Sequence, residues 1–332
     1  MIRAVITIGS NSTRMLCASV LDGKVTVIGR GREETRLFLG LDEEGRLTPE
    51  AMAGCVRAVR SLTDEAREEG AQGTVRVYAT SATRDAVNQA EFLALLRKAG
   101  CPARVLTGEE EASLAFRAAA DGDDALVTDI GGGSTELVRG RGGIISRSVS
   151  LQLGASRLYR ISPISSLSSL NRIRDVIQRT LAGAEDILTS DPPQVLCGIG
   201  GTLTSLASVM LEQPFLKEDQ DRIPVPFPFL RETLERISVM PEEERLRVTG
   251  IPPTRIRYIP HGLAILEQIC LMGHFDHVTV RTKTNLDALI ACPTEKEDHD
   301  EKDLDLGGSH PAVLRGGDRD THRPEEQPAG GV

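Results

Sequence analysis

A pattern of strand, glycine-rich turn and strand occurs twice in this sequence, at positions roughly 120 residues apart. The first copy spans residues 2–30 around the turn Gly9-Ser10-Asn11-Ser12, and the second spans residues 125–151 around Gly131-Gly132-Gly133-Ser134. In each copy β-branched and apolar residues flank the turn, as expected for strands. The repeat predicts two duplicated α/β domains that face each other, although the slight identity between the copies leaves coincidence as an alternative.

Each copy is followed by alternating helix and strand patterns, which are typical of an α/β fold. Thr48 and Pro49 predict the start of a helix, because an N-cap threonine followed by proline favours the first turn. Further helices are expected at residues 88–98, 109–120, 203–211 and 262–272, and further strands at residues 75–80, 103–107 and 194–199. We therefore predict an N-terminal domain at residues 1–120 and a second domain at residues 121–292.

The last forty residues, 293–332, differ in composition from the rest of the chain. They hold eleven Asp and Glu residues against five Lys and Arg residues, and they contain no Phe, Tyr or Ile. Such a segment cannot bury enough apolar surface to offset the entropy of ordering. It is predicted to be an acidic, disordered tail.

Composition excludes several classes of function. The net charge is −9 and the chain has seven Phe, three Tyr and no Trp, so neither a basic field nor stacking aromatics favour nucleic-acid binding. No stretch is long and apolar enough to span a membrane. The six cysteines lack Cys-x-x-Cys spacing, which favours reduced thiols, no structural metal and a cytoplasmic location.

Three glycine-rich turns follow strands, and together they indicate a cleft that binds phosphate. They are Gly9-Ser10-Asn11-Ser12, Gly131-Gly132-Gly133-Ser134-Thr135 and Gly198-Ile199-Gly200-Gly201-Thr202. Glycine lets backbone N–H groups approach an anion, and Ser and Thr hydroxyls add donors. The alternative is that each turn merely needs a positive φ. Neither a Walker motif nor a dinucleotide-binding glycine motif is present.

Charged residues beside these turns are candidates for chemistry. Asp129 ends a strand just before the glycine run, where a carboxylate could hold Mg²⁺ next to phosphate. One residue of the run 109–111, Glu-Glu-Glu, could orient a water as a general base, although a charged first helical turn is the simpler interpretation. Arg84 could clamp a phosphate or pair with its neighbour Asp85.

Six motifs occur in the order and spacing of the exopolyphosphatase and guanosine pentaphosphate phosphohydrolase (Ppx/GppA) family, which residues 1–290 resemble. They are Ile8-Gly-Ser-Asn-Ser-Thr-Arg14, Ala79-Thr-Ser-Ala-Thr-Arg-Asp85, Thr107-Gly-Glu-Glu-Glu-Ala112, Asp129-Ile-Gly-Gly-Gly-Ser-Thr-Glu136, Leu153-Gly-Ala155 and Gly198-Ile-Gly-Gly-Thr202. The resemblance implies a duplicated actin-like, sugar-kinase-like (ribonuclease H-like) fold with an interdomain cleft. It also implies release of terminal phosphate from inorganic polyphosphate, and in some members from guanosine pentaphosphate, with Mg²⁺. Homodimerisation is expected from the resemblance alone.

The resemblance assigns roles by position. Glu111 matches the catalytic glutamate, and Asp129 and Glu136 match the carboxylates on the metal side. The expected phosphate-binding residues are Gly9, Ser10, Asn11, Ser12, Arg84, Gly131, Gly132, Gly133, Ser134, Gly200, Gly201 and Thr202.

Two positions and one segment depart from the family pattern. Thr7 and Arg257 stand where Asp is usual, and residues 280–287 match the closing motif poorly. Because Thr7 removes a carboxylate from the metal side, these departures favour a second hypothesis, a polyphosphate- or alarmone-binding protein with weakened catalysis. A third hypothesis, an ATP-dependent kinase of the same fold, ranks last because nothing in the sequence identifies an acceptor site.

Overall fold

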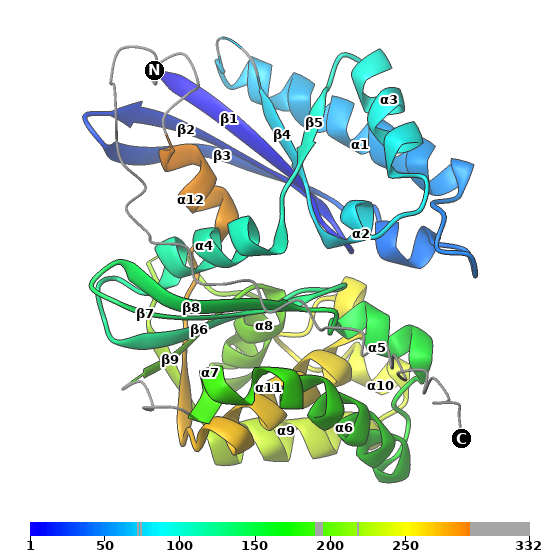
Figure 1. Cartoon of the computed structure of the whole chain (residues 1–332), viewed down its shortest axis with the longest axis vertical. Helices are drawn as coiled ribbons and strands as arrows, with labels where there is room; N and C mark the ends of the chain where they lie inside the picture. Colours follow the sequence, from blue (N-terminus) through cyan, green and yellow to red (C-terminus); the bar gives the residue numbers. More distant parts are fainter. Residues whose placement is uncertain (72, 74, 190–194, 218, 293–332) are drawn as a thin grey trace, which may run out of the picture. The chain divides into compact units, whose positions relative to one another are not determined.

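The first sheet is built on the hairpin that opens the sequence. In the computed structural model, β1 (Ile2–Ile8), β2 (Thr13–Leu21) and β3 (Lys24–Glu33) form an antiparallel meander. The strands β4 (Arg76–Ala79) and β5 (Ala103–Val105) extend the sheet in parallel on the other side of β1. The strand order is β3-β2-β1-β4-β5 (Figure 1).

The second sheet repeats this order and adds one strand. Its order is β10-β11-β9-β6-β7-β8. The strands are β6 (Ala125–Ile130), β7 (Thr135–Arg141), β8 (Ile144–Leu151), β9 (Val195–Ile199), β10 (Ile223–Pro226) and β11 (His277–Val280). The meander β6-β7-β8 corresponds to β1-β2-β3, and the parallel strands β9 and β11 correspond to β4 and β5.

The correspondence between the two meanders extends to single residues. The register of β2 against β3 shifts between Cys17 and Ala18, and that of β7 against β8 shifts between Arg139 and Gly140, at the same distance from each glycine turn. This repeated irregularity confirms the duplication predicted from the sequence. The chain therefore has the duplicated α/β architecture that its resemblance to the Ppx/GppA family implied.

Helices of the first half cover the sheet as the sequence predicted. The helix α1 (Pro49–Glu68) begins at Thr48, whose Oγ1 accepts a hydrogen bond from the Ala51 amide at 3.3 Å. Met52, Val59 and Leu62 of this helix are buried, and Val56 is partly buried. The short helix α2 (Ser81–Arg84) and the helix α3 (Gln89–Lys98) complete this half.

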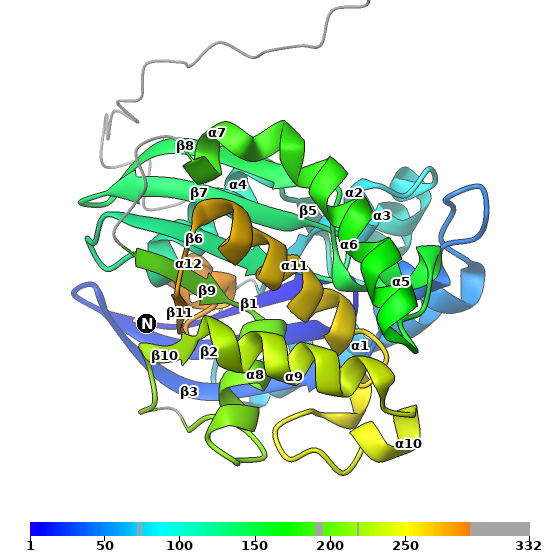
Figure 2. The same cartoon turned by 90° about the horizontal axis from the view of Figure 1, so that it is seen from below.

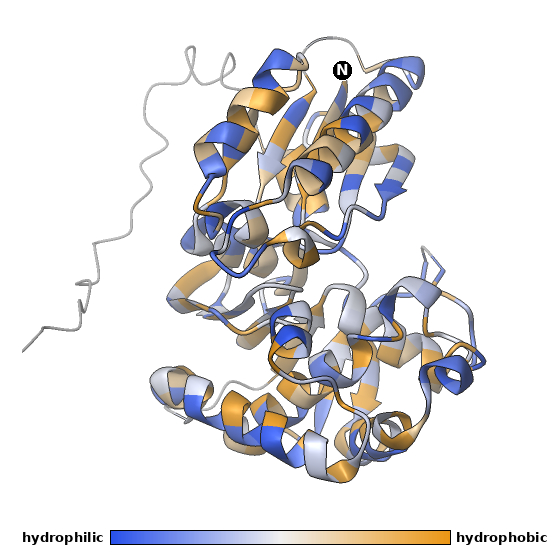
Figure 3. Ribbon diagram, turned by 90° about the vertical axis from the view of Figure 1, so that its right-hand side faces the viewer, coloured by the Kyte–Doolittle hydropathy of each residue, from blue (hydrophilic) through white to orange (hydrophobic). Residues whose placement is uncertain are grey.

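Helices of the second half are more numerous than predicted. The structure has α5 (Ala155–Ile161), α6 (Leu167–Leu181), α7 (Glu185–Thr189), α8 (Gly201–Met210), α9 (Phe227–Val239), α10 (Glu242–Arg245) and α11 (Ile259–Gly273). Only α8 and α11 were expected. The helix α11 packs against α6 and α9 (Figure 2) and is buried along most of its length. Hydrophobic and hydrophilic residues recur in turn along the outer helices, as amphipathic helices require (Figure 3).

Two helices lie between the sheets, and they are equivalent in the two halves. The helices α4 (Gly108–Ala119) and α12 (Asn285–Ala291) each begin after a threonine N-cap with a capping box, Thr107 and Thr284. The helix α4 packs on β7 and β8 of the second sheet, whereas α12 packs on β1 and β2 of the first sheet and on α4 (Figure 1). These helices bring side chains to the space where the two sets of loops meet.

The structure describes residues 1–71, 73, 75–189, 195–217 and 219–292. Residues 1–292 form one compact unit, and the predicted tail at 293–332 lies outside the described residues. None of the helices in the described ranges combines the length and the apolar character needed to cross a membrane.

Candidate active site

A pocket with a volume of about 170 Å³ lies between loops of the two sheets. Most of the predicted site residues line it: Gly9, Ser10, Asn11, Ser12, Glu111, Asp129, Gly131, Gly132, Gly133, Ser134, Glu136, Gly201 and Thr202. Arg84 and Gly200 are not among the lining residues but lie directly behind them. Segments far apart in the sequence therefore meet in one place.

The first two glycine turns have the same local geometry and lie against each other. The amide of Gly9 donates to the Ser12 carbonyl oxygen at 3.1 Å, and the amide of Gly131 donates to that of Ser134 at 3.0 Å. A Cβ atom on Gly132 would lie 2.8 Å from the Ser10 Cβ, too close for any other residue. These turns thus need glycine for close approach.

The third turn needs glycine for a different reason. Gly200 has φ 90°, a left-handed conformation that side chains disfavour, and a Cβ atom there would lie 2.8 Å from Oδ1 of Asp129. The alternative explanation, that a turn needs glycine for its positive φ, therefore holds for Gly200. It does not hold for Gly9 or for the glycines at 131–133, whose φ angles are not positive.

Asp129 and Glu136 face each other across the hairpin β6-β7. Asp129 Oδ2 accepts a hydrogen bond from Asn285 Nδ2 at 3.0 Å, and Glu136 Oε1 accepts one from Ser150 Oγ at 2.8 Å. Glu136 is only 2% exposed. In the first hairpin, Thr7 and Arg14 occupy the corresponding positions and also line the pocket.

The structure distinguishes the three glutamates that open α4. Glu109 is exposed, and Glu110 closes the capping box with Thr107 and pairs with Arg104 at 2.6 Å. Glu111 is 5% exposed and lines the pocket. The simpler interpretation, a charged first turn, thus applies to the first two residues but does not account for the buried position of the third.

Arg84 is paired with Glu111. Its Nη1 donates to Glu111 Oε1 and, at 2.8 Å, to the Leu106 carbonyl oxygen, while its buried Nη2 has no partner among the described residues. The alternative pairing with Asp85 is wrong, because Asp85 accepts instead from Arg157 at 2.6 Å. The role of Arg84 in phosphate binding stays a prediction.

Burial raises the pKa of Glu111, Asp129 and Glu136, three of the carboxyl groups that line the pocket. It raises the pKa of Glu111 to about 7, although Arg84 opposes this, and the pKa of Asp129 to about 6, although Arg14 opposes this. Burial and then the charges of Glu111 and Asp129 raise the pKa of Glu136 well above its usual value. Close, buried carboxylates repel one another, and a cation between them would offset this cost.

Three arginines that sequence reasoning did not assign also line the pocket: Arg14, Arg32 and Arg255. Arg255 Nη1 donates to the Gly201 carbonyl oxygen at 2.6 Å, and Arg14 Nε donates to Ser12 Oγ at 3.1 Å. Burial and then neighbouring arginines lower the pKa of Arg255 to about 9 and that of Arg14 to about 10. Positive charge accumulated in this way favours an anionic ligand.

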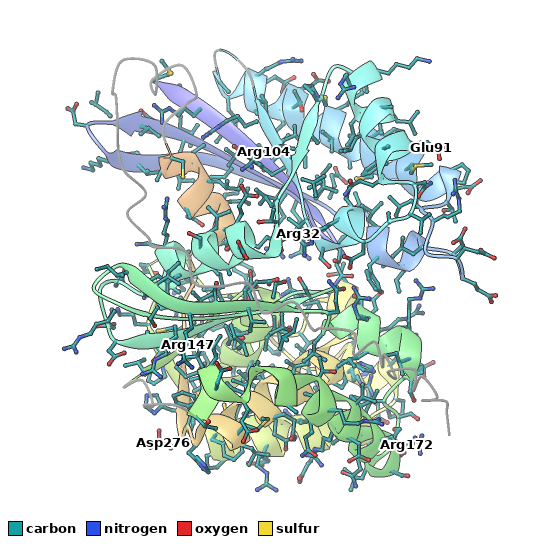
Figure 4. All side chains as sticks on the ribbon, viewed as in Figure 1. Arg32, Glu91, Arg104, Arg147, Arg172 and Asp276 are labelled. Atoms are coloured by element: carbon teal, nitrogen blue, oxygen red, sulfur yellow. The ribbon has the colours of Figure 1, made fainter. Side chains whose placement is uncertain are left out.

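The arginines come from distant parts of the chain. Arg32 extends from the end of β3 and lies at the edge of the first sheet that faces the second (Figure 4), where it pairs with Glu34 at 2.5 Å. Arg14 ends the first glycine motif, so its position in the sequence could have identified it as a residue of the pocket. Nothing in the local sequence around Arg255 indicates that it reaches the third turn.

The departures from the family pattern lie at different distances from the pocket. Thr7 lines it, and so do Thr284 and Asn285 of the weak closing motif. Arg257 is exposed and pairs with Glu242 at 3.1 Å. Arg281 is 1% exposed and bonds Asp221 at 2.9 Å, so it stabilises the fold. Thr7, Thr284 and Asn285 are therefore the departures with direct bearing on the site.

The donor set of the pocket fits a magnesium ion. No group of three His, Cys, Asp or Glu residues in the described ranges is arranged as a complete metal site. Magnesium is usually held by one or two carboxylates, with water and phosphate oxygens completing its shell. Asp129 and Glu136 supply two carboxylates at the edge of a pocket with phosphate-type donors, which is the arrangement that this ion needs.

Comparison with known proteins identifies the family to which this duplicated α/β fold belongs. The family model described as the Ppx/GppA phosphatase family matches residues 16–282, and the chain belongs to this family. A crystal structure of the Aquifex aeolicus family member is 25% identical, with a TM-score of 0.75 over 91% of this chain and 99% of that one. A structure titled an exopolyphosphatase from Cytophaga hutchinsonii has a TM-score of 0.80 at 20% identity, over 87% and 96% of the two chains, and shows the same fold.

Proposed function

We propose that this protein is an exopolyphosphatase-type hydrolase that releases terminal phosphate from inorganic polyphosphate, with guanosine pentaphosphate as a second candidate substrate. The observation that carries this proposal is one pocket with opposed charges. Arg14, Arg32 and Arg255 line it together with the glycine turns, and Asp129, Glu136 and Glu111 line it as well. Opposed groups of this kind suit a polyanion that is bound together with a divalent cation.

The arginines and the turns would bind the substrate. Backbone N–H groups of the loops at 9–12 and 131–134 and the guanidinium groups of Arg14 and Arg255 are donors for phosphate oxygens. The buried Nη2 of Arg84 is a further unused donor beside Glu111. These fixed donors would hold the terminal phosphoryl group and offset charge on its equatorial oxygens.

Glu111 would act as the general base. A pKa of about 7 leaves a substantial carboxylate fraction at neutral pH and still allows proton uptake. Glu111 would take a proton from a water whose oxygen forms a bond to the terminal phosphorus, and the bond from phosphorus to the bridging oxygen would break. Arg84 holds the Glu111 carboxylate in place. Mg²⁺ held by Asp129 and Glu136 would neutralise phosphate oxygens.

Phosphate release from long-chain polyphosphate with Mg²⁺ tests the proposal. We expect release by the wild type, near-complete loss in Glu111→Gln, and little change in Glu109→Gln, which alters an exposed neighbour in the same helical turn. Guanosine pentaphosphate, assayed in parallel, distinguishes the two substrates. Equal release by wild type and Glu111→Gln would contradict the role of Glu111.

The second candidate is a polyphosphate- or alarmone-binding protein with weakened catalysis, and the position of Thr7 favours it. Thr7 lines the pocket without offering a carboxylate. This candidate predicts tight polyphosphate binding, no release by wild type, and release that appears in Thr7→Asp.

The domain boundary after residue 120, the homodimer and the cytoplasmic location stay predictions. Light scattering after size-exclusion chromatography tests the homodimer, for which twice the 35.8 kDa chain mass is expected.

A further inference from the structure

Asn285 uses only one end of its side-chain amide within the protein. It is the first residue of α12 and lines the pocket. Its Nδ2 donates to Asp129 Oδ2 at 3.0 Å. Its Oδ1 is buried and accepts no hydrogen bond from any residue that the structure describes. A buried amide oxygen without a partner costs stability, so a donor or a cation is required there.

The surroundings of Oδ1 favour a cation. An amide has its two polar atoms on the same carbon, so Oδ1 lies close to Asp129, to which Nδ2 is bonded. The nearby carboxylates of Asp129, Glu136 and Glu111 add to one another's negative field. Side-chain amide oxygens are ligands for hard divalent cations such as Mg²⁺ and Ca²⁺.

Asn285 also lies on the side of the site where a carboxylate is absent. The helix α12 packs on β1 and β2, the two strands that carry Thr7 and Arg14. Thr7 has the register position of Asp129 but not its charge. An oxygen delivered by α12 thus reaches the pocket from the first sheet, opposite the carboxylates of the second sheet.

We propose that Asn285 Oδ1 is an oxygen ligand of the divalent cation held by Asp129 and Glu136, and that it takes the place of the carboxylate which Thr7 does not supply. The inference rests on the proposed function for the presence of that cation. In this arrangement Nδ2 fixes Asp129 while Oδ1 contacts the ion, so a single side chain performs both tasks.

Mn²⁺ binding to the full chain, measured by electron paramagnetic resonance or calorimetry without substrate, tests this proposal. Asn285→Leu has a similar shape but lacks both polar atoms, and we expect it to weaken Mn²⁺ binding about tenfold. Asn285→Asp keeps the oxygen and loses the N–H group, and we expect it to bind Mn²⁺ at least as tightly as wild type. The control Lys283→Ala, at an exposed position two residues earlier, should leave binding unchanged.

Two results would overturn the proposal. Unchanged Mn²⁺ affinity in Asn285→Leu would show that Oδ1 does not contact the ion. Equal weakening in Asn285→Leu and Asn285→Asp would assign the effect to the hydrogen bond from Nδ2, and if both variants fail to fold, Asn285→Ser replaces them with the same expected weakening. Phosphate release is measured separately, so a wild type that binds Mn²⁺ but releases no phosphate contradicts only the proposed function.

Discussion

Thr7 and Arg14 occupy in the hairpin β1-β2 the cross-strand positions that Asp129 and Glu136 occupy in β6-β7. The two hairpins have matching turns, each closed by the same hydrogen bond, and matching irregularities further along. Their charges are opposite: the first presents a cation to the pocket and the second presents two carboxylates. Duplication therefore provided two copies of one backbone. Under the proposed function, the different residues at two positions in each copy would separate anion binding from cation binding.

The largest expected effect comes from removing a carboxylate of the second hairpin. We expect Asp129→Asn and Glu136→Gln each to reduce phosphate release by about 10²–10³-fold, because each removes negative charge that would hold the cation beside the substrate. Thr7→Val, at the position in the first hairpin that matches Asp129, should change release less than about fivefold, since a hydroxyl is a poor cation ligand. Steady-state phosphate release is measured for all three variants. Equal losses in Asp129→Asn and Thr7→Val would contradict the proposed difference between the two hairpins.

A smaller effect is expected from removing the cation of the first hairpin. A hydrogen bond to a charged group contributes about 1.5–3 kcal/mol, so Arg14→Gln should raise KM for polyphosphate by about 10–100-fold. Because Arg14 also lowers the pKa of Asp129, the acid limb of the pH profile should move to higher pH. The matched control is Arg67→Gln, which changes an arginine that is 60% exposed on α1. A fall in kcat without a rise in KM would contradict the assignment of Arg14 to polyphosphate binding.

Giving the first hairpin the carboxylate of the second is expected to have a modest effect on Mn²⁺ affinity. Thr7→Asp introduces a carboxylate in register with Arg14, and we expect it to tighten Mn²⁺ binding about three- to tenfold. If Asn285 already supplies the missing oxygen, Thr7→Asp should increase Mn²⁺ affinity more in the Asn285→Leu variant than in the wild type. Calorimetry on the four combinations of these two substitutions gives the coupling, and additive effects would contradict a shared ion.

The smallest effect on phosphate release is expected from substitution of His261. Its titration affects the stability of the fold at acid pH, the range in which the carboxylates of the second hairpin also take up protons. Burial lowers the pKa of His261 to about 4, from an ordinary value of 6.5. Between these values the unfolded chain binds a proton that the folded chain does not. The stability present above pH 6.5 is therefore lost as the pH falls toward 4, by on the order of 3 kcal/mol.

Denaturant unfolding of wild type and His261→Gln over this range measures the difference. Glutamine keeps a donor for the Ser162 carbonyl oxygen, which lies 2.9 Å from His261 Nε2. The difference between the two proteins should decline as the pH falls. A constant difference would show that His261 does not titrate in this range.

The sequence allowed the duplication and most of the pocket to be predicted because glycine turns between β-branched strands are local signals. The same logic placed Asp129 beside the second turn and identified the N-cap Thr48. It did not find α5, α6 or α9, whose helical pattern was not assigned. The approach of Arg255 to Gly201, fifty-four positions earlier, depends on how the chain packs and has no local signal.

Sequence reasoning also missed the equivalence of Thr7 with Asp129, which requires the strand register, and the contact of Asn285 with Asp129, whose positions are 156 apart in the chain. The resemblance to the family identified Thr7 as a departure. The structure adds that the oxygen-bearing side chain of Asn285 lines the same pocket, on a helix that packs against the strand of Thr7.

Separate titrations of Mn²⁺ and polyphosphate test most directly whether the two hairpins divide the binding of cation and anion. Mn²⁺ is titrated without polyphosphate, and polyphosphate is titrated with a chelator present, against wild type, Arg14→Gln and Glu136→Gln. We predict that Glu136→Gln loses Mn²⁺ binding and keeps polyphosphate binding, whereas Arg14→Gln keeps Mn²⁺ binding and loses affinity for polyphosphate. Loss of both ligands in both variants, or the reverse pattern, would contradict the account.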